Sequence, residues 1–357
     1  MNPDSTTHRR DFLKTTALTS IALAGGHLQA AAPRIKIGQI GTKHAHASGK
    51  IASIRKLSDT YEVSGMVEED PSARDKATNN KSYEGLRWMT EKQLLATPGL
   101  QAVAVETDIP DLVPTGIRCV ERGLHIHLDK PAGDNLKDCH RLHDAAKANG
   151  VTVQMGYMLR YNPGFEFLFD VLKKGWLGPI REVHGNMGKF SPDDSRKHMA
   201  RYDGGGIFEL ACHVIDSLVT VLGKPDRIIP INKRTYSQKD SFADNQLAIF
   251  EYEGAIATIG CNHIDRMGGP NRSFTVVGED GTLEIKPLEA PKVRLGLSKA
   301  VDGFKRGFQD VPMRKATGRY DDEFRDLAKI IRGEKKLAWS HEHDLIVQEC
   351  VLKASGM

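Results

Sequence analysis

The chain has 357 residues, of which 39% are hydrophobic and 27% are charged. This length accommodates two domains with cores of their own, and the composition is that of an ordinary globular protein. Because the formal net charge is only +4 and no basic stripe stands out, we expect no nucleic-acid partner.

The first 32 residues have the features of an export signal. Arg9 and Arg10 precede a short, weakly apolar run, and small residues follow around Ala30. This pattern is typical of a twin-arginine signal peptide, which directs a folded protein to the twin-arginine export machinery and is then removed. We therefore expect a periplasmic or otherwise exported protein. No later apolar run is long enough to span a membrane, so we expect no membrane contact in the mature form.

From residue 34 to about residue 155, strand-like and helix-like segments alternate. Strands are predicted at residues 35–40, 62–67, 102–105, 124–128 and 151–155. Strands that alternate with helices indicate a parallel sheet with right-handed crossovers. We therefore assign residues 33–157 to an α/β, doubly wound Rossmann domain. The five cysteines form no C-x-x-C pair, so neither a disulfide framework nor a cysteine metal site is indicated.

The second half of the chain has a different pattern. Helices are predicted at residues 165–174, 206–222, 321–331 and 342–353, and strands at residues 180–185, 227–233, 246–252, 255–261, 273–277 and 282–285. Hairpin turn signals between the later strands favour antiparallel pairing. Residues 158–357 are therefore predicted to form an α+β domain with a large, mostly antiparallel sheet.

The loop after the first predicted strand has the position of a dinucleotide site. Where a G-x-G-x-x-G fingerprint is expected, the chain has Gly41-Thr42-Lys43-His44-Ala45-His46. Gly41 keeps the tight turn, while a lysine and a histidine replace the other two glycines. Because N–H groups at a helix N-terminus hold phosphate without glycines, we interpret the site as altered rather than absent. Gly41, Thr42, Lys43 and His44 are predicted to contact the cofactor.

An acidic residue at the end of the second strand favours NAD over NADP. Glu68 stands 27 residues after Gly41, where a carboxylate binds the ribose 2′-hydroxyl and repels a 2′-phosphate. The His44-x-His46 pair also has the spacing of metal ligands. With 14 histidines in the chain and no third ligand in view, we expect no metal there.

A lysine follows the fourth predicted strand. In Asp129-Lys130-Pro131 the proline keeps Lys130 out of helical geometry, so the lysine lies where the strand stops. Ligands of open α/β sheets bind at this carboxyl edge. Lys130 is therefore a candidate site residue, and a surface Lys-Pro pair is the alternative.

A second candidate group lies on the helix that follows Gly204-Gly205-Gly206. Glu209, His213 and Asp216 are spaced at i, i+4 and i+7, which is one face of an α-helix. An imidazole between two carboxylates is suited to proton transfer near neutral pH. The alternative is a polar stripe that faces water.

Between the two predicted domains, "QMGYMLRYNPGF" contains Arg160 and Tyr161. We expect both to line an interdomain cleft and to bind polyol oxygens. The alternative is a hinge with solvated polar residues.

Taken in order, these motifs resemble the glucose–fructose oxidoreductase, inositol dehydrogenase and rhizopine catabolism family (Gfo/Idh/MocA). "DKP" is similar to the family's E-K-P, "YMLRYNP" to its arginine-containing segment, and "GGGIFELACHVID" to its glycine pair followed by D-x-G-x-H-x-x-D. The resemblance extends from Arg34 to the closing "HDLIVQECVLKASGM". It implies the two-domain fold, a homodimer or homotetramer, and a sugar or cyclitol substrate.

The resemblance also implies roles for single residues. Lys130 matches the lysine beside the substrate hydroxyl and the nicotinamide, and His213 matches the catalytic histidine. Glu209 replaces an aspartate and Asp129 replaces the glutamate of E-K-P, so each acid changes length and keeps its charge. Thr107 matches a threonine of the cofactor site. In this reading Glu209 is catalytic and Asp129 contacts the cofactor.

These observations predict an exported NAD-dependent oxidoreductase. Hydride would pass between a carbohydrate or cyclitol carbon and a tightly bound NAD. His213 would exchange the hydroxyl proton, Lys130 would stabilise the alkoxide, and Glu209, Arg160, Tyr161 and Asp216 would hold the substrate. Two alternatives stay open: a redox-neutral NAD-dependent glycosidase or epimerase on the same scaffold, and a non-catalytic carbohydrate-binding relative.

Overall fold

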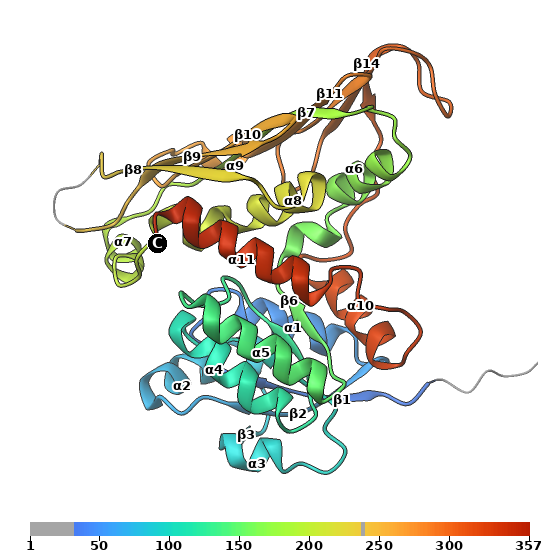
Figure 1. Ribbon diagram of the computed structural model, residues 1–357. Helices are drawn as coiled ribbons and strands as arrows, with labels where there is room; N and C mark the ends of the chain where they lie inside the picture. Colours follow the sequence, from blue (N-terminus) through green and yellow to red (C-terminus); the bar gives the residue numbers. More distant parts are fainter. Residues whose placement is uncertain (1–31, 237–239) are drawn as a thin grey trace, which may run out of the picture. The chain divides into compact units, whose positions relative to one another are not determined.

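The computed structural model describes residues 32–236 and 240–357, and Arg34–Met357 forms one compact unit. The paired arginines of the expected export signal lie outside the described residues. The unit contains a six-stranded sheet built from its first part and an eight-stranded sheet built from its second part (Figure 1). The predicted fold class is therefore confirmed.

The six-stranded sheet is parallel throughout, in the order β3-β2-β1-β4-β5-β6. Its strands are β1 (Ile35–Ile40), β2 (Tyr61–Val67), β3 (Trp88–Met89), β4 (Ala102–Val105), β5 (His125–Leu128) and β6 (Val153–Met155). Every residue of β4 is buried, as expected of a central strand with helices on both faces. Strand β3 was not predicted, because two residues show no periodicity.

Five helices accompany this sheet: α1 (Ala47–Lys56), α2 (Pro71–Thr78), α3 (Glu91–Leu95), α4 (Ile109–Val120) and α5 (Leu136–Ala148). Asp70 caps α2 by accepting the N–H groups of Ser72 and Ala73. Helix α1 differs, because its N-cap residue His46 makes no side-chain capping bond. The N-terminus of α1 is therefore not closed by a side chain, as an anion-binding helix end requires.

The eight-stranded sheet has the order β14-β13-β12-β11-β7-β10-β9-β8. Its strands are β7 (Ile180–Gly188), β8 (Arg227–Lys233), β9 (Asn245–Tyr252), β10 (Ala255–Asn262), β11 (Ser273–Gly278), β12 (Gly281–Ile285), β13 (Val293–Leu297) and β14 (Gly307–Val311). All pairs are antiparallel except β7 with β10. Helices and two further strands separate β7 from β10 in sequence, which is the long connection that a parallel pair needs.

Helices lie on one face of this sheet (Figure 1). They are α6 (Pro163–Lys173), the π-helical turn η3 (Ile207–Ala211), α8 (Cys212–Leu222) and α11 (His341–Ser355). Strands β9 and β10 alternate between buried and more exposed residues, which is the pattern of a sheet covered on one side. The exposed apolar side chains of this sheet include Ile231, Leu247, Ile256 and Phe308.

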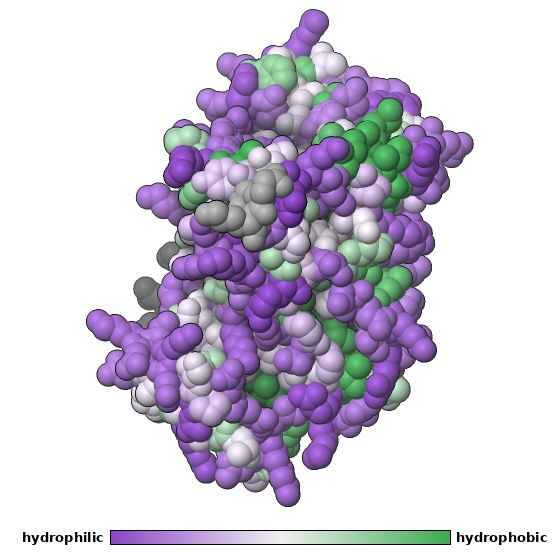
Figure 2. All heavy atoms as spheres, turned by 90° about the vertical axis from the view of Figure 1, so that its left-hand side faces the viewer, coloured by the Kyte–Doolittle hydropathy of each residue, from purple (hydrophilic) through white to green (hydrophobic). Residues whose placement is uncertain are grey.

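The face drawn in Figure 2 is largely hydrophilic, and its hydrophobic side chains gather along one side. Within the described residues, no helix combines the length and apolar character that a membrane crossing requires.

The last part of the chain returns to the six-stranded sheet, where α10 (Asp321–Ile331) packs against α1. The Nζ atom of Lys50 lies 2.5 Å from Oε1 of Glu323 and 2.8 Å from Nε2 of His127. The hydroxyl of Tyr61 donates to the carbonyl of Phe324 at 2.6 Å. Both contacts are buried, so α10 is fixed to the sheet by polar as well as apolar contacts.

Candidate active site

The loop after β1 turns close to the chain that follows β4. Gly41 has φ of +94°, and a Cβ atom there would lie 2.4 Å from the backbone nitrogen of Thr107. Only glycine fits this conformation and this approach. The first glycine of the fingerprint is thus kept for a steric reason.

Glu68 lies beside this loop at the end of β2. Its Oε2 accepts the backbone N–H and the hydroxyl of Thr42, at 2.9 and 2.7 Å, and its Oε1 accepts the N–H of Asp70 at 3.1 Å. Lys43 forms an ion pair with Asp70, with 2.9 Å between Nζ and Oδ2. Lys43 therefore points across the loop toward the second strand rather than into the helix–strand packing.

A cavity of about 270 Å³ opens at the carboxyl ends of β1, β2 and β4. Gly41, Lys43, Glu68 and Thr107 line it together with further acidic residues, namely Glu69, Asp70, Glu91, Asp108 and Asp111. This place at the strand ends is where open α/β sheets bind dinucleotides. A wall so rich in carboxylates suits the hydroxyls of an adenosine ribose and repels a 2′-phosphate. The residues therefore fit NAD. Thr42 and His44 line an adjacent cavity of about 480 Å³.

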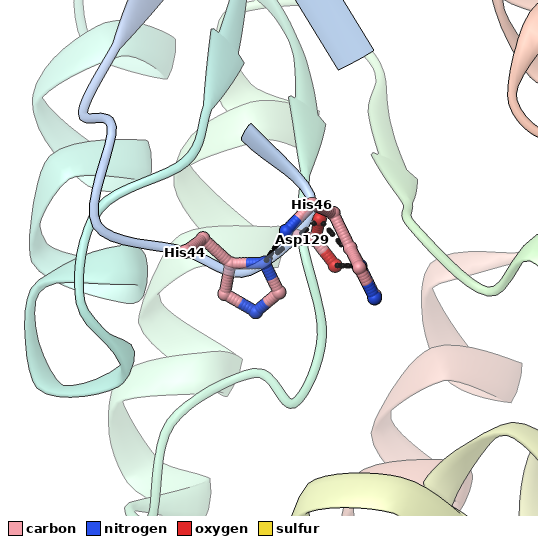
Figure 3. Close-up of side chains that lie close together, drawn as sticks. All are labelled: His44, His46 and Asp129. Atoms are coloured by element: carbon pink, nitrogen blue, oxygen red, sulfur yellow. Dashed lines mark hydrogen bonds and ion pairs between the residues drawn. The ribbon is translucent and has the colours of Figure 1, made fainter. Parts of the chain in front are cut away.

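His44 and His46 lie on either side of the Asp129 carboxylate (Figure 3). Nδ1 of His44 is 3.2 Å from Oδ2 of Asp129, and Nδ1 of His46 is 3.1 Å from the same oxygen. Burial lowers the pKa of His46 to about 4. Burial alone would raise the pKa of Asp129, but the two histidines and Lys50 outweigh it and hold this pKa well below its usual range. His46, which stands at the position of the third fingerprint glycine, thus points to the end of β5.

Lys130 follows Asp129, is joined to Pro131 by a cis peptide bond, and is almost fully buried. Its Nζ donates to the backbone carbonyl of Glu209 at 2.6 Å. Lys130, Glu209 and His213 line one cavity of about 210 Å³, together with His46. The structure therefore brings together the three residues that the sequence assigned to catalysis.

The π-helical turn η3 carries Glu209 into this cavity. It follows Gly204 and Gly205, which both have positive φ. Single π turns within α-helices occur frequently at functional sites. Burial would raise the pKa of Glu209, but Lys130 and Lys189 outweigh it and keep this carboxylate ionised, with 3.1 Å between its Oε2 and Nζ of Lys189.

His213 is buried in the wall of the cavity. Burial lowers its pKa well below the usual range, and the charge of Lys130 lowers it further. Its Nδ1 has no hydrogen-bond partner among the described residues. The imidazole is therefore neutral near pH 7 and able to accept a proton.

The cavity carries more positive than negative charge. Its ionic lining consists of Lys130, Lys189, Arg272, Arg319, Glu209 and Glu289. Glu209 pairs with Lys189, and Glu289 pairs with Arg272. Four of these residues were not predicted from the sequence, namely Lys189, Arg272, Glu289 and Arg319. They come from separate loops and show no motif, so only the fold brings them together.

Arg160, Tyr161 and Asp216 do not line this cavity. Nη2 of Arg160 lies 2.6 Å from Oδ1 of Asp216 and 2.6 Å from Oδ1 of Asp344, and all three side chains are buried. The hydroxyl of Tyr161 donates to Asp326 at 3.0 Å. This placement corrects the expectation that they lie beside the substrate with Lys130 and His213: Arg160 and Asp216 pair with each other, and Arg160 and Tyr161 line a different cavity.

Asp216 also does not share a face with Glu209. Glu209 lies within η3, where hydrogen bonds run from i to i+5, so its spacing to Asp216 in α8 is not the α-helical spacing on which that expectation rested.

Comparison with known proteins agrees with this fold. A family model described as an oxidoreductase family with an NAD-binding Rossmann fold matches residues 35–157, and a GFO/IDH/MocA C-terminal domain model matches residues 165–284. An uncharacterized oxidoreductase of Rhizobium meliloti is 25% identical over 200 residues, which are 56% of this chain and 59% of that protein. The chain thus spans less than two thirds of that relative.

Two further proteins match over most of their length. Inositol 2-dehydrogenase of Salmonella typhimurium is 22% identical over 301 residues, covering 82% of this chain and 83% of that enzyme. The solved structure of levoglucosan dehydrogenase in complex with NADH and levoglucosan has a TM-score of 0.78 at 14% identity, covering 91% of this chain and 98% of that one. The family models confirm the NAD-binding Rossmann domain, and the chain belongs to the Gfo/Idh/MocA family of oxidoreductases.

Proposed function

We propose that the protein transfers hydride between a carbohydrate or cyclitol hydroxyl carbon and NAD. The observation that carries this proposal is the single cavity that holds Lys130, His213 and Glu209 beside the NAD-binding loop. The C-terminal domain supplies His213 and Glu209, and the carboxyl edge of the six-stranded sheet supplies Lys130. A substrate in this cavity therefore touches both parts of the chain.

The neutral imidazole of His213 takes the proton of the substrate hydroxyl during oxidation and returns it during reduction. The ammonium of Lys130 stabilises the alkoxide that develops on the same oxygen. Glu209, ionised and held by Lys189, accepts hydrogen bonds from neighbouring hydroxyls and orients the ring. Bound NAD supplies the acceptor for the hydride.

The excess positive charge of the cavity points to a substrate class. Arg319 lines the cavity, its guanidinium lies 5.5 Å from the ring centre of Tyr320, and no carboxylate of the described residues lies within ion-pair distance of it. We propose that the preferred substrate carries a carboxylate, as a sugar acid does, since an anion balances this charge.

The motif at Arg9 and Arg10 supports export of the folded protein with its cofactor. Since free NAD is scarce outside the cytoplasm, we propose a tightly held cofactor that is recycled in each catalytic cycle. The exposed apolar side chains of the large sheet, such as Ile256 and Phe308, support a homodimer or homotetramer formed through that face.

The first test measures the nucleotide released when the purified protein is denatured. About one NAD(H) per chain is expected. Lys130→Met should keep the bound nucleotide and lower the rate of sugar-acid oxidation by about 100- to 1,000-fold, the usual cost of losing an electrostatic stabiliser. Unchanged turnover in this variant would contradict the proposed chemistry. Absence of NAD binding would contradict the whole proposal.

A further inference from the structure

Four ionisable side chains converge beneath the NAD-binding loop. His44 and His46 come from the loop, Asp129 from the end of β5, and Glu106 from the residue after β4. The ligand atoms of His44, His46 and Asp129 all lie within 4.8 Å of one another (Figure 3). Oε2 of Glu106 lies 3.7 Å from Nδ1 of His44. Both carboxylates are completely buried.

The hydrogen-bond pattern of His44 leaves a lone pair directed at the carboxylates. Its Nε2 is 3.0 Å from the carbonyl oxygen of Lys130, and a carbonyl only accepts, so Nε2 carries the hydrogen. Nδ1 is therefore the ring atom that is available to a metal ion bound beside Asp129. It faces Oδ2 of Asp129 at 3.2 Å, and among the described residues only the backbone N–H of His46 donates to it, at 3.3 Å.

Glu106 provides a second, independent observation. Neither of its carboxylate oxygens has a hydrogen-bond partner among the described residues. A fully buried carboxylate without partners is costly and rare in proteins. Two buried carboxyl groups and an imidazole nitrogen that face one another must share either a proton or a bound metal ion.

We propose that His44, His46 and Asp129 bind one divalent transition-metal ion, with Zn²⁺ as the best match, and that the buried carboxyl group of Glu106 lies next to this site. Two imidazoles and one carboxylate are a ligand set that zinc accepts, with the fourth position left for water. Bonds of about 2.0–2.2 Å place neighbouring atoms of a tetrahedron about 3.3–3.6 Å apart. The separations of 3.2 and 3.1 Å between Oδ2 of Asp129 and the two imidazole nitrogens lie close to this range.

The outer contacts also resemble those of a metal site. Metal-binding histidines usually donate their other N–H to a carbonyl or a carboxylate, as His44 does to Lys130. Oδ1 of Asp129 accepts the backbone N–H of Lys130 at 2.7 Å. The ion thereby positions the backbone of Lys130 and holds the loop whose second and third glycines are missing.

In another buried cluster an arginine neutralises the charge of the carboxylates. Asp216, His343 and Asp344 also lie close enough to share an ion. There the guanidinium of Arg160 reaches both carboxylates at 2.6 Å and supplies the positive charge. Among the described residues, no lysine or arginine lies within ion-pair distance of Glu106, and the charge of Lys50 acts on Glu106 and Asp129 only from farther away.

The test uses the untagged protein, freed of metal with a chelator and titrated with Zn²⁺ and with Co²⁺ as a spectroscopic probe. We expect one equivalent per chain and visible d–d bands of tetrahedral Co²⁺. Glu106→Gln and His44→Ala should each weaken binding at least about tenfold. His184→Ala is the matched control, since this exposed histidine also contacts a carboxylate, Glu182, at 3.0 Å, and it should bind like the wild type.

The proposal is overturned if the wild type binds well below one equivalent, which would mean that a proton occupies the cluster instead. It is equally overturned if Glu106→Gln binds as tightly as the wild type, which would indicate adventitious binding elsewhere. Because Glu106→Gln preserves the size of the side chain, it decides the matter even if His44→Ala fails to fold. NAD content, measured in parallel, separates this result from the proposed hydride transfer.

Discussion

Replacing Lys50 with methionine tests how the C-terminal helix α10 is attached to the six-stranded sheet. The Lys50 ammonium is completely buried, 2.5 Å from Oε1 of Glu323, and 4.3 Å from the ring centre of Tyr320. Methionine retains most of the volume, so the change removes the charge and leaves the Glu323 carboxyl without its partner. Breaking a buried ion pair from one side costs about 3–5 kcal/mol, and we expect this loss at pH 8.

The cost should depend on pH in a defined direction. Burial raises the pKa of Glu323 to about 7 even with Lys50 in place. A carboxyl group whose pKa is higher in the folded than in the unfolded protein stabilises the folded state. This stabilisation is complete at pH values below the pKa of the unfolded protein and is lost as the pH rises through the pKa of the folded protein. Without Lys50 the folded pKa is higher still. At pH 5 the carboxyl is protonated in both proteins, whereas at pH 8 only the wild type has it ionised. The destabilisation caused by Lys50→Met should therefore be about 1.4 kcal/mol larger at pH 8 than at pH 5.

Urea denaturation of both proteins at pH 5 and pH 8 measures this difference. In a Glu323→Gln background, the effect of Lys50→Met should lose its dependence on pH. The reasoning is refuted if Lys50→Met destabilises the protein equally at both pH values, or more at pH 5.

Three further predictions concern the loop after β1, the cavity lined by Lys130 and His213, and the buried cluster of Arg160, Asp216 and Asp344. Gly41→Ala should destabilise the protein by more than about 1 kcal/mol and abolish NAD retention, because its Cβ would meet Thr107; normal NAD content after denaturation would contradict this. Arg319→Ala should raise KM for a sugar acid at least about tenfold more than for the matching neutral sugar, the loss of one charge-assisted contact; an equal rise for both sugars would exclude a carboxylate contact. At pH 7.5, Asp216→Asn should cost about 3–5 kcal/mol in urea denaturation. Asp344→Asn should cost less, since burial raises the pKa of Asp344 to about 6 and its Oδ2 has no partner among the described residues; the opposite order would refute this assignment.

The positions of the candidate active-site residues were partly visible in the sequence. Lys130 ends a parallel strand and His213 follows a run of glycines, so local pattern placed both of them at the carboxyl edge or at a helix start. The helix that carries His213 was predicted, but its π turn was not, because propensity does not distinguish an α-helical from a π-helical turn. The grouping of Glu209, His213 and Asp216 on one face failed for this reason.

By itself, the sequence determined the two-part architecture, the NAD site and the lysine and histidine of the cavity, since these depend on alternation, turn residues and motif spacing, which are local. Only the tertiary structure decided the rest. Arg160 and Asp216 are 56 residues apart, and their burial against each other was not visible in either segment. The His44-x-His46 pair meets Asp129 and Glu106, which stand at least 60 residues farther along the chain. They reach the loop only because β4 pairs with β1, and β5 with β4, in one parallel sheet.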